Sequence, residues 1–477
     1  MIIYPHRFSG LVRVPASKSH TIRRLILASM ADGIFDILHP LDCPDTRSCV
    51  SVCRALGAEI DERRAIDLTS PNPVDEKGEK LVSWNVRGLK KSNFSSINMG
   101  TIKETKQNDE GNIQCNVGNS GTTLFLALAM AALGTDPVTF DGDEQTRQRS
   151  AGPLLEALSG LGVSLKSSSY GSVPGCVPIT IRGPLKGGRV SISCPTSQYL
   201  SALLLAAPFA PAGVVTEIDV PLLNERPYID MTLSYLDSFC FRYEAAEDFS
   251  WFKIPGGQGG NLRFHDPVPG DFSSAAFPAA AAAITGGSVT LLGLNHDDKQ
   301  GDKVYFDFLS RMGCDVSWEQ VKKEWHLHVS RSVPLKNGEF DLNDTPDLLP
   351  VMAAAACFAE GDTSLVNVAH ARIKETDRIA VMAEELPKLG VKTTERPDGL
   401  IVHGCGGIPG RIPGRAMASD KTPEFPYRFK VDGRKDHRVI MALACAALGC
   451  PALVEISGAE NAGLSYPGFI DLILSQK

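Results

Sequence analysis

The sequence has no excess of positive charge and no long uninterrupted apolar segment. Its 477 residues carry a formal net charge of −7, which argues against a surface built to bind nucleic acid or an anionic membrane. A transmembrane helix needs about 20 apolar residues, and the best candidate, 199–215, is interrupted by Pro208, Pro211 and Gly213. We therefore expect neither a nucleic-acid nor a membrane partner, although local cations could still bind a small anionic ligand.

Two further absences concern location and metal binding. The N-terminus lacks the apolar stretch and cleavage site of a signal peptide. The 12 cysteines are scattered, without a Cys-x-x-Cys pair or a His/Cys cluster at zinc spacing. We therefore expect buried, reduced thiols, no metal site and a cytoplasmic protein.

What the sequence does contain is a two-helix pattern that occurs six times. In each case a small apolar helix comes first, and an amphipathic helix follows about 30 residues later, which is typical of a repeated supersecondary unit. The first helices are expected to begin near Ser19, Ser120, Ser197, Ser273, Asp347 and His437. The second helices are expected near Asp45, Ser150, Tyr228, Asp302, Glu375 and Tyr466.

Short β-rich runs follow each first helix, and weaker strand signals follow most second helices. The first runs are 34–38, 138–140, 214–218, 288–292, 363–366 and 452–456. This alternation predicts an α/β fold made of β-α-β-α-β-β units. Because a chain of this length exceeds one ordinary core, we expect two domains of three units each: 15–267, and 268–477 together with the N-terminal strand in 1–14.

One segment interrupts the repeat. Residues 71–111 are polar, rich in Lys, Asn, Ser and Glu, and have little apolar patterning. We interpret this segment as a surface insertion in the first domain, partly mobile.

Polar residues at the first-helix starts suggest anion binding, because helix N-termini present unpaired N–H groups and a positive dipole end. Lys18 and Ser19 precede Arg23 by about one turn, and a glycine-rich turn, Gly118–Thr123, enters the second of these helices. Taken singly, the first motif is more typical of an ordinary capped helix with exposed basic residues, and the second fits an ordinary helix start as well as it fits a ligand site.

The segment 374–378 gives a stronger signal. Lys374 and Arg378 are four residues apart, so on a helix they would project from one face, where an anion or carboxylate between them would offset their repulsion. Asp347, at the head of the preceding helix, supplies a carboxylate that could act as a base, or could simply cap the helix.

Taken together, these motifs resemble the enolpyruvyl transferases of the shikimate pathway, the 5-enolpyruvylshikimate-3-phosphate synthase family. The resemblance runs from about Pro5 to the C-terminus, without 71–111. It rests on Ser17-Lys18-Ser19 with Arg23, Gly118–Thr122, Arg149, Ser197-Gln198, Arg226-Pro227-Tyr228, Gly270-Asp271 with Ser273-Ser274, Gln300-Gly301-Asp302, Pro346-Asp347, 374–378 and Asp436-His437-Arg438.

The resemblance implies an inside-out α/β barrel architecture with two domains that close over a cleft. It also implies transfer of the enolpyruvyl group of phosphoenolpyruvate to the 5-hydroxyl of shikimate 3-phosphate, with release of phosphate and without a metal or organic cofactor. The partners expected are these two small molecules alone, and the protein is expected to be a monomer.

The resemblance also implies a role for each matching residue. Those for shikimate 3-phosphate are Lys18, Ser19, Arg23, Thr196, Ser197, Gln198, Tyr228, Asp347, His370 and Lys374. Those for phosphoenolpyruvate are Lys18, Gly121, Arg149, Gln198, Arg378 and Arg438. Asp347 would be the base for the attacking hydroxyl, and Glu375 and Lys18 would deliver protons.

Three residues depart from the family pattern: Phe125 stands where the family has Arg, Leu464 where it has Lys, and Glu225 where it has a phosphate-binding Ser. Each change lowers the positive charge around anionic ligands. They motivate an alternative, a paralogue that binds without turnover or uses another acceptor. The related transferases that act on a UDP-amino sugar match less well, because they have Lys-Asn at 18–19 and a cysteine in the loop corresponding to 143–149.

Overall fold

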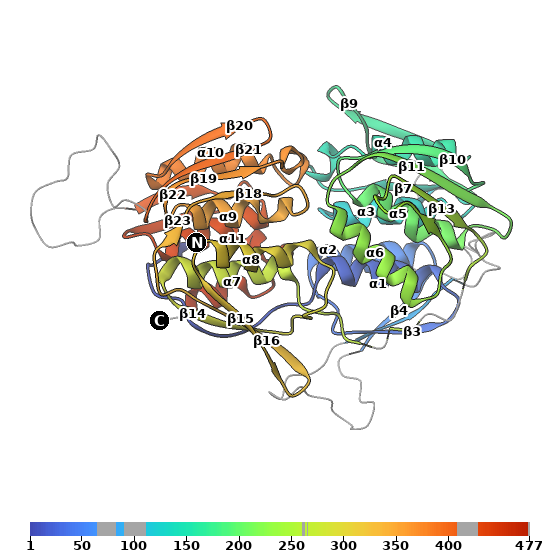
Figure 1. The fold of residues 1–477 in the computed structure, drawn as a ribbon. Coiled ribbons are helices and arrows are strands. Elements are labelled where there is room, and N and C mark those ends of the chain that lie inside the picture. The colour runs from blue at the N-terminus through green and yellow to red at the C-terminus, as the bar shows by residue number, and fades with distance from the viewer. Residues whose placement is uncertain (64–82, 90–110, 260–262, 265, 408–427, 476–477) are drawn as a thin grey trace, which may run out of the picture. The chain divides into compact units, whose positions relative to one another are not determined.

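A computed structural model describes residues 1–63, 83–89, 111–259, 263–264, 266–407 and 428–475. The chain divides into two units, one of Met1–Pro15 with Pro269–Lys477 and the other of Ala16–Val268. We call them unit 1 and unit 2, and each is described by itself (Figure 1). No helix in the described ranges is both long and apolar enough to cross a membrane.

Unit 2 contains three sheets among its described residues, with the strand orders β3-β5-β4, β6-β7-β9-β8 and β10-β11-β13-β12. The strands are β3 (Ile34–Leu38), β4 (Glu59–Arg63), β5 (Ser83–Arg87), β6 (Ile113–Asn116), β7 (Val138–Asp141), β8 (Ser164–Tyr170), β9 (Val173–Arg182), β10 (Gly188–Cys194), β11 (Val215–Leu223), β12 (Glu244–Ala245) and β13 (Trp251–Pro255). The helices are α1 (Lys18–Met30), α2 (Pro44–Ala55), α3 (Gly121–Ala131), α4 (Gly152–Gly160), α5 (Gln198–Ala206) and α6 (Arg226–Ser238).

Unit 1 likewise contains three sheets in its described part, with the orders β1-β23-β22, β15-β16-β14-β2 and β17-β19-β21-β20, where β18 also pairs with β19. The strands are β1 (Ile2–Ile3), β2 (Gly10–Arg13), β14 (Ser288–Leu292), β15 (Asp315–Val321), β16 (Glu324–Ser330), β17 (Leu335–Lys336), β18 (Glu339–Asp341), β19 (Ala359–Val366), β20 (Lys392–Arg396), β21 (Gly399–Cys405), β22 (Arg428–Asp432) and β23 (Leu453–Ser457). The helices are α7 (Phe272–Thr285), α8 (Tyr305–Arg311), α9 (Leu349–Ala356), α10 (Arg378–Glu385), α11 (His437–Leu448) and α12 (Phe469–Ser475).

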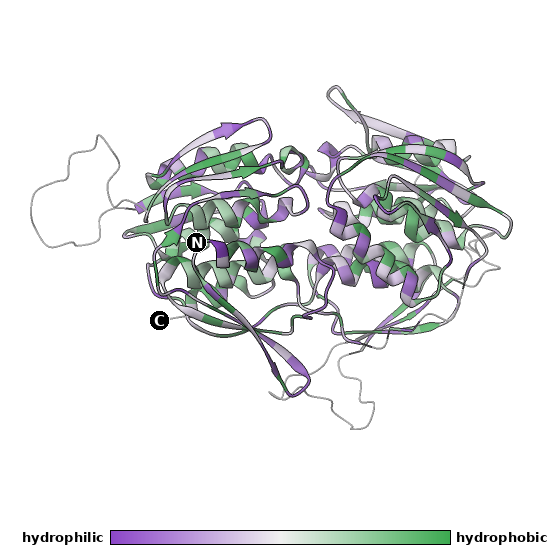
Figure 2. Cartoon of the chain, viewed as in Figure 1, coloured by the Kyte–Doolittle hydropathy of each residue, from purple (hydrophilic) through white to green (hydrophobic). Residues whose placement is uncertain are grey.

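Within each unit, the first helices of the repeat pack against one another and each also packs on a sheet. In unit 1, α7, α9 and α11 are in mutual contact and pack on β14, β19 and β23 respectively. Nearly every residue of these three helices is buried, and hydrophobic residues predominate along them (Figure 2). A helix that is apolar on all sides is buried, so these three helices form the core of the unit.

The pairing of the strands explains why a helix connects them. Strands β6 and β7 are parallel, as are β10 and β11, β18 and β19, and β22 and β23. Parallel neighbours require a crossover, and the intervening helices α3, α5, α9 and α11 supply it. Helices α3, α5, α9 and α11 therefore each lie between two parallel strands in the chain, as the alternating pattern predicts.

The interpretation of 71–111 as a wholly surface insertion is wrong for one part of it. Residues 83–87 form the central strand β5 of the β3-β5-β4 sheet, and the side chains of Trp84 and Val86 are fully buried. They alternate with Asn85 and Arg87, which is the period of a half-buried strand, but the strand is too short to stand out from its polar surroundings. Most of the remainder, 71–82 and 90–110, lies outside the described residues.

Candidate functional site

The start of α1 places Lys18 beside a carboxylate. The Ser17 hydroxyl caps the helix by accepting a hydrogen bond from the His20 amide at 3.4 Å. Lys18 Nζ lies 2.9 Å from Asp45 Oδ2, and both side chains are largely buried. The predicted anion-binding lysine is therefore paired with the first turn of α2.

Arg23 is buried beneath the same helix start and connects several predicted residues. Its guanidinium donates to the Ser19 carbonyl at 3.3 Å, to Thr232 Oγ1 at 3.0 Å and to the Tyr228 carbonyl at 3.4 Å, and it lies 5.9 Å from the centre of the Tyr228 ring. Burial lowers the pKa of Arg23 to about 10, so it remains a cation at neutral pH. The structure thus brings Ser19, Arg23 and Tyr228 together.

The predicted phosphate-binding residues Thr196 and Ser197 converge on one carboxylate oxygen, Glu225 Oε2. The Thr196 hydroxyl, the Ser197 amide and the Ser197 hydroxyl donate to it at 3.0, 3.0 and 2.8 Å. Gln198, the first residue of α5, has a buried Oε1 that lacks a hydrogen-bond partner among the residues described. Three donors are therefore gathered at the start of α5, as expected for an anion site.

Gly121 and Arg149 are in direct contact at the start of α3. A β-carbon on Gly121 would lie 2.8 Å from Arg149 Nη1, so the absence of a side chain is what admits the guanidinium. Arg149 also donates to the carbonyl and the side-chain oxygen of Asn119, at 3.3 Å each. The glycine-rich turn therefore positions a cation at this helix start.

In unit 1, the predicted residues form a buried ion network around Arg378. Its guanidinium donates to Asp347 at 2.6 Å, to Glu375 at 2.6 Å and to Asp436 at 2.8 Å. Arg438 Nη2 lies 2.9 Å from the second Asp347 oxygen. The side chain of Arg378 is 1% exposed and that of Arg438 is 5% exposed, so the two guanidinium groups are shielded from solvent, which strengthens their hydrogen bonds to the carboxylates.

Asp347 joins the two arginines and is held ionised by them. Burial of the carboxyl group favours its neutral form, but the charges of Arg438 and Arg378, together with Lys374, outweigh this effect and hold the pKa of Asp347 well below its ordinary value. In this state the carboxylate is a weak base. Any anion that drew the arginines away from Asp347 would raise its pKa.

The expectation that Lys374 and Arg378 project from one helical face is wrong. Helix α10 begins at Arg378, capped by Asp377, whose side chain accepts from the Ala380 amide at 3.0 Å. Lys374 precedes the helix and has a non-helical backbone. The four-residue spacing would fit a helix that includes Lys374, but Asp377 is a strong N-cap and the helix begins after it. His370 lies buried in the short 3₁₀ helix Ala369–Ile373, just before Lys374.

The three departures from the family pattern have different surroundings. Phe125 is buried in α3 and packs edge to face on Tyr199, with ring centroids 5.0 Å apart. Leu464 ends the short 3₁₀ helix Ala459–Leu464 and is half-buried. Glu225 lies inside the Thr196–Ser197 donor group. Phe125 thus serves the core, whereas Glu225 affects the proposed ligand site directly.

The sequence does not predict two carboxylates that pair with candidate site residues, Asp45 in unit 2 and Asp436 in unit 1. Asp45 pairs with Lys18, and Asp436 pairs with Arg378 and also caps α11 through the Arg438 amide at 2.9 Å. Asp436 stands in the quoted Asp436-His437-Arg438 motif, and Asp45 opens a predicted helix. Their cationic partners are distant in sequence, so no local pattern connects them.

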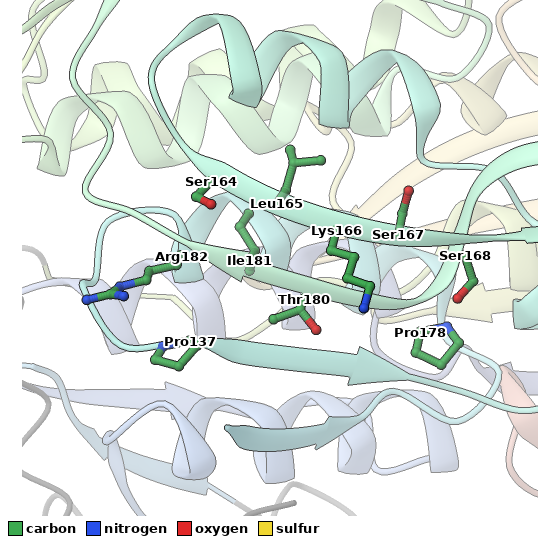
Figure 3. Close-up of a pocket in the computed structure, with 10 residues that line it drawn as sticks. All are labelled: Pro137, Ser164, Leu165, Lys166, Ser167, Ser168, Pro178, Thr180, Ile181 and Arg182. Carbon is green, nitrogen blue, oxygen red and sulfur yellow. The ribbon is translucent and has the colours of Figure 1, made fainter. Parts of the chain in front are cut away.

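A pocket of about 390 Å³ lies elsewhere in unit 2, over the β8 and β9 strands (Figure 3). Side chains of Lys166, Pro178, Thr180 and Arg182 line it. It contains none of the predicted site residues, which cluster at helix starts. We therefore assign the candidate site residues of each unit to its helix starts and not to this pocket. In the ranges the structure describes, no group of three or more His, Cys, Asp or Glu is arranged to hold a metal ion.

The chain matches the family model of EPSP synthase (3-phosphoshikimate 1-carboxyvinyltransferase) over residues 3–78 and 85–473. The expectation that the resemblance omits 71–111 is therefore wrong for most of that segment. A 3-phosphoshikimate 1-carboxyvinyltransferase of Acetivibrio thermocellus is 40% identical over 471 residues, covering 98% of this chain and 95% of the relative. One of Halorubrum lacusprofundi is 36% identical, covering 97% and 94%.

Solved structures agree with the sequence relatives. The fold is similar to that of an EPSP synthase from Acinetobacter baumannii, with a TM-score of 0.71, 25% identity and coverage of 99% of this chain and 96% of that one. The mixed α/β, two-domain fold is thus that of the EPSP synthase structures. With a family match over nearly its whole length, the chain belongs to the EPSP synthase (3-phosphoshikimate 1-carboxyvinyltransferase) family.

Proposed function

We propose that this protein transfers the enolpyruvyl group of phosphoenolpyruvate to the 5-hydroxyl of shikimate 3-phosphate and releases phosphate, as a step of aromatic amino acid biosynthesis. The observation that carries the proposal is the pair of buried guanidinium groups, Arg378 and Arg438, joined by Asp347 in a chain that matches the family from residue 3 to 473. Two buried cations sharing a carboxylate fit a site that accepts a compact, multiply charged anion.

The residues proposed for each substrate are those implied by the family resemblance. For shikimate 3-phosphate these are Lys18, Ser19, Arg23, Thr196, Ser197, Gln198 and Tyr228 of unit 2, with Asp347, His370 and Lys374 of unit 1. For phosphoenolpyruvate they are Lys18, Gly121, Arg149 and Gln198 of unit 2, with Arg378 and Arg438 of unit 1. The contacts Arg23–Ser19 and Gly121–Arg149 support these groupings.

Substrate anions would take the places of the chain's own carboxylates. In the structure, Arg378 is paired with Asp347, Glu375 and Asp436, and Arg438 is paired with Asp347. A carboxylate and a phosphate group present the same kind of acceptor oxygen to a guanidinium. Binding is therefore an exchange of one set of charge-assisted hydrogen bonds for another, and the cations are held in place beforehand.

This exchange would also prepare the base. While both arginines contact Asp347, its pKa stays well below the ordinary value and it has little tendency to accept a proton. When phosphoenolpyruvate engages the arginines, their hold on Asp347 weakens and the added negative charge raises its pKa. Asp347 could then accept the proton of the 5-hydroxyl.

The bond changes balance with the groups proposed. The 5-oxygen of the acceptor bonds to the substituted enol carbon, and the bond from that carbon to the phosphate oxygen breaks. The proton lost by the hydroxyl leaves overall with the phosphate. Glu375, 2.6 Å from Arg378, and Lys18 are the groups we propose to move protons at the methylene carbon and at the leaving phosphate. No metal or organic cofactor enters this scheme.

The finer architecture is also part of the proposal. We propose an inside-out α/β barrel of six β-α-β-α-β-β repeats, three in residues 15–267 and three in 268–477 with 1–14. The recurring combination of a parallel pair with an adjacent antiparallel strand supports it, as in β6-β7-β9 and β10-β11-β13. That the protein is a cytoplasmic monomer remains a prediction, which sedimentation velocity and cell fractionation would test.

The choice of acceptor tests the proposed function. Purified protein with phosphoenolpyruvate would be offered shikimate 3-phosphate, shikimate or a UDP-amino sugar, and the products identified by mass spectrometry. We expect the enolpyruvyl adduct of shikimate 3-phosphate alone. An adduct of another acceptor, or none, would favour the paralogue alternative.

A further inference from the structure

Glu225 fills the donor group that would hold the 3-phosphate. Thr196 Oγ1, Ser197 N and Ser197 Oγ each have one hydrogen to donate, and all three are directed at Glu225 Oε2, at 3.0, 3.0 and 2.8 Å. A phosphate group cannot accept these hydrogens while the carboxylate keeps them. Ligand binding and the Glu225 contact are therefore mutually exclusive at this point.

Glu225 is buried and has an uncommon backbone conformation. Glu225 is 2% exposed and lies at the junction of β11 and α6 with a left-handed backbone, φ 59° and ψ 42°, which residues other than Gly, Asn and Asp adopt infrequently. Its charge favours the cationic form of the buried Arg23. The carboxylate is thus held among donors and beside a cation, as a bound phosphate oxygen would be.

We infer that Glu225 is an internal competitor for the phosphate subsite, so that a bound phosphate displaces its carboxylate from Thr196 and Ser197. Glu225 would then set the affinity for the phosphorylated acceptor without touching the rest of that molecule. Identifying the phosphate as that of shikimate 3-phosphate rests on the proposed function, whereas the exchange itself rests on the three hydrogen bonds.

Two substitutions separate occupancy of the subsite from its charge. Glu225→Ser empties the donor group, and Glu225→Gln keeps the length of the side chain but removes its charge. Because the three hydrogen bonds to Glu225 no longer have to be broken, Glu225→Ser should lower the Kd for shikimate 3-phosphate by about tenfold to a hundredfold, the effect of about one charge-assisted hydrogen bond. Glu225→Gln should give a smaller gain. Glu156→Gln, an exposed glutamate on α4 of the same unit, controls for the loss of one negative charge.

Two further probes, unphosphorylated shikimate in calorimetry and inorganic phosphate, show whether the effect belongs to the phosphate. Unphosphorylated shikimate should bind the wild type and Glu225→Ser with the same Kd, because Glu225 need not move. Inorganic phosphate, followed by nuclear magnetic resonance titration, should bind Glu225→Ser more tightly than the wild type. Thermal melting confirms that each variant is folded, and Glu225→Gln serves as the test if Glu225→Ser is not.

A double-mutant cycle with Ser197→Ala tests the exchange itself. In the wild type, the Ser197 hydroxyl donates to a carboxylate before binding and to a phosphate afterwards, so its removal should change the Kd for shikimate 3-phosphate little. In Glu225→Ser, the hydroxyl gains a charged acceptor only on binding, so its removal should raise the Kd about tenfold. The two substitutions should therefore be strongly non-additive.

The inference is overturned if Glu225→Ser and Glu225→Gln bind shikimate 3-phosphate and inorganic phosphate no more tightly than the wild type, or if shikimate gains as much as its phosphate. Failure of the proposed function has a different signature. In that case no variant would release phosphate from phosphoenolpyruvate with shikimate 3-phosphate, while tighter binding of inorganic phosphate by Glu225→Ser would still support the exchange.

Discussion

Replacing Asp347 by asparagine separates its two roles, as a bridge between arginines and as the proposed base. The aspartate accepts from Arg378 at 2.6 Å and pairs with Arg438 at 2.9 Å. Asparagine keeps one acceptor oxygen and loses the charge, so about one charge-assisted hydrogen bond is lost. Such a bond contributes about 1.5–3 kcal/mol. Because the Asp347 side chain is 23% exposed, we expect a loss of unfolding free energy near the lower end, about 1.5 kcal/mol.

The effect on catalysis should be larger than the effect on binding. A lost general base lowers turnover by about 10²-fold or more, whereas the Kd for shikimate 3-phosphate should change only by a modest factor. Initial rates at saturating substrates give kcat, and calorimetry gives the Kd. Asp344→Asn, the same substitution at an exposed position three residues earlier, is the matched control and should leave both values unchanged.

The pH dependence of stability gives a second readout of the same substitution. Because the pKa of Asp347 is held below its ordinary value of 3.8, its ionised form stabilises the folded protein fully above that pH. The contribution is lost as the pH falls through the lower folded-state pKa. The difference in unfolding free energy between wild type and Asp347→Asn should therefore be constant from about pH 5 to about pH 8, where Asp347 is ionised in both the folded and the unfolded protein. It should shrink in stronger acid.

Normal turnover of Asp347→Asn would refute the base assignment and transfer the role to Glu375 or Lys18. A difference in stability that grew as the pH fell would contradict the ionised state assigned to Asp347 in the folded protein.

Three other predictions address the departures, the thiols and the core. Leu464→Lys should lower the Michaelis constant for phosphoenolpyruvate roughly tenfold and leave that for shikimate 3-phosphate nearly unchanged, as measured by steady-state kinetics. If both Michaelis constants stayed the same, another cation would compensate for the missing lysine. Of the twelve thiols, only those of Cys240 and Cys405 are exposed, so a thiol reagent should label two quickly and the rest after unfolding; faster labelling of more would contradict the assigned burial. Trp84→Ala should lower the free energy of unfolding in urea by about 3–5 kcal/mol. A loss under about 1 kcal/mol would contradict the burial of Trp84 and indicate that 83–87 lie at the surface.

The sequence predicts the helices well because local signals define their starts. Serine or aspartate caps precede α1, α3, α7 and α11, and the actual N-caps are Ser17, Ser120, Asp271 and Asp436. Strands that follow apolar helices are equally visible, and 34–38 and 288–292 are found with the expected bounds. Strand β5 is missed because its two inward residues lie in a long polar segment.

The site is less visible because its contacts join distant residues. Local motifs indicate the cations, but their partners, Asp45 for Lys18 and Asp436 for Arg378, are 27 and 58 residues away. The sequence shows Glu225 in place of the family's serine, but only the structure shows its carboxylate among the Thr196 and Ser197 donors. Contacts between charged residues that are distant in sequence form only when the chain folds, and no local sequence pattern shows them.

Release of inorganic phosphate from phosphoenolpyruvate tests the central claim most directly. Purified wild-type protein would be incubated with shikimate 3-phosphate and phosphoenolpyruvate, together and singly, and phosphate followed by a coupled assay. The account predicts steady phosphate release that requires both substrates and falls about 10²-fold in Asp347→Asn. No release with both substrates present, in protein shown to be folded, would contradict it.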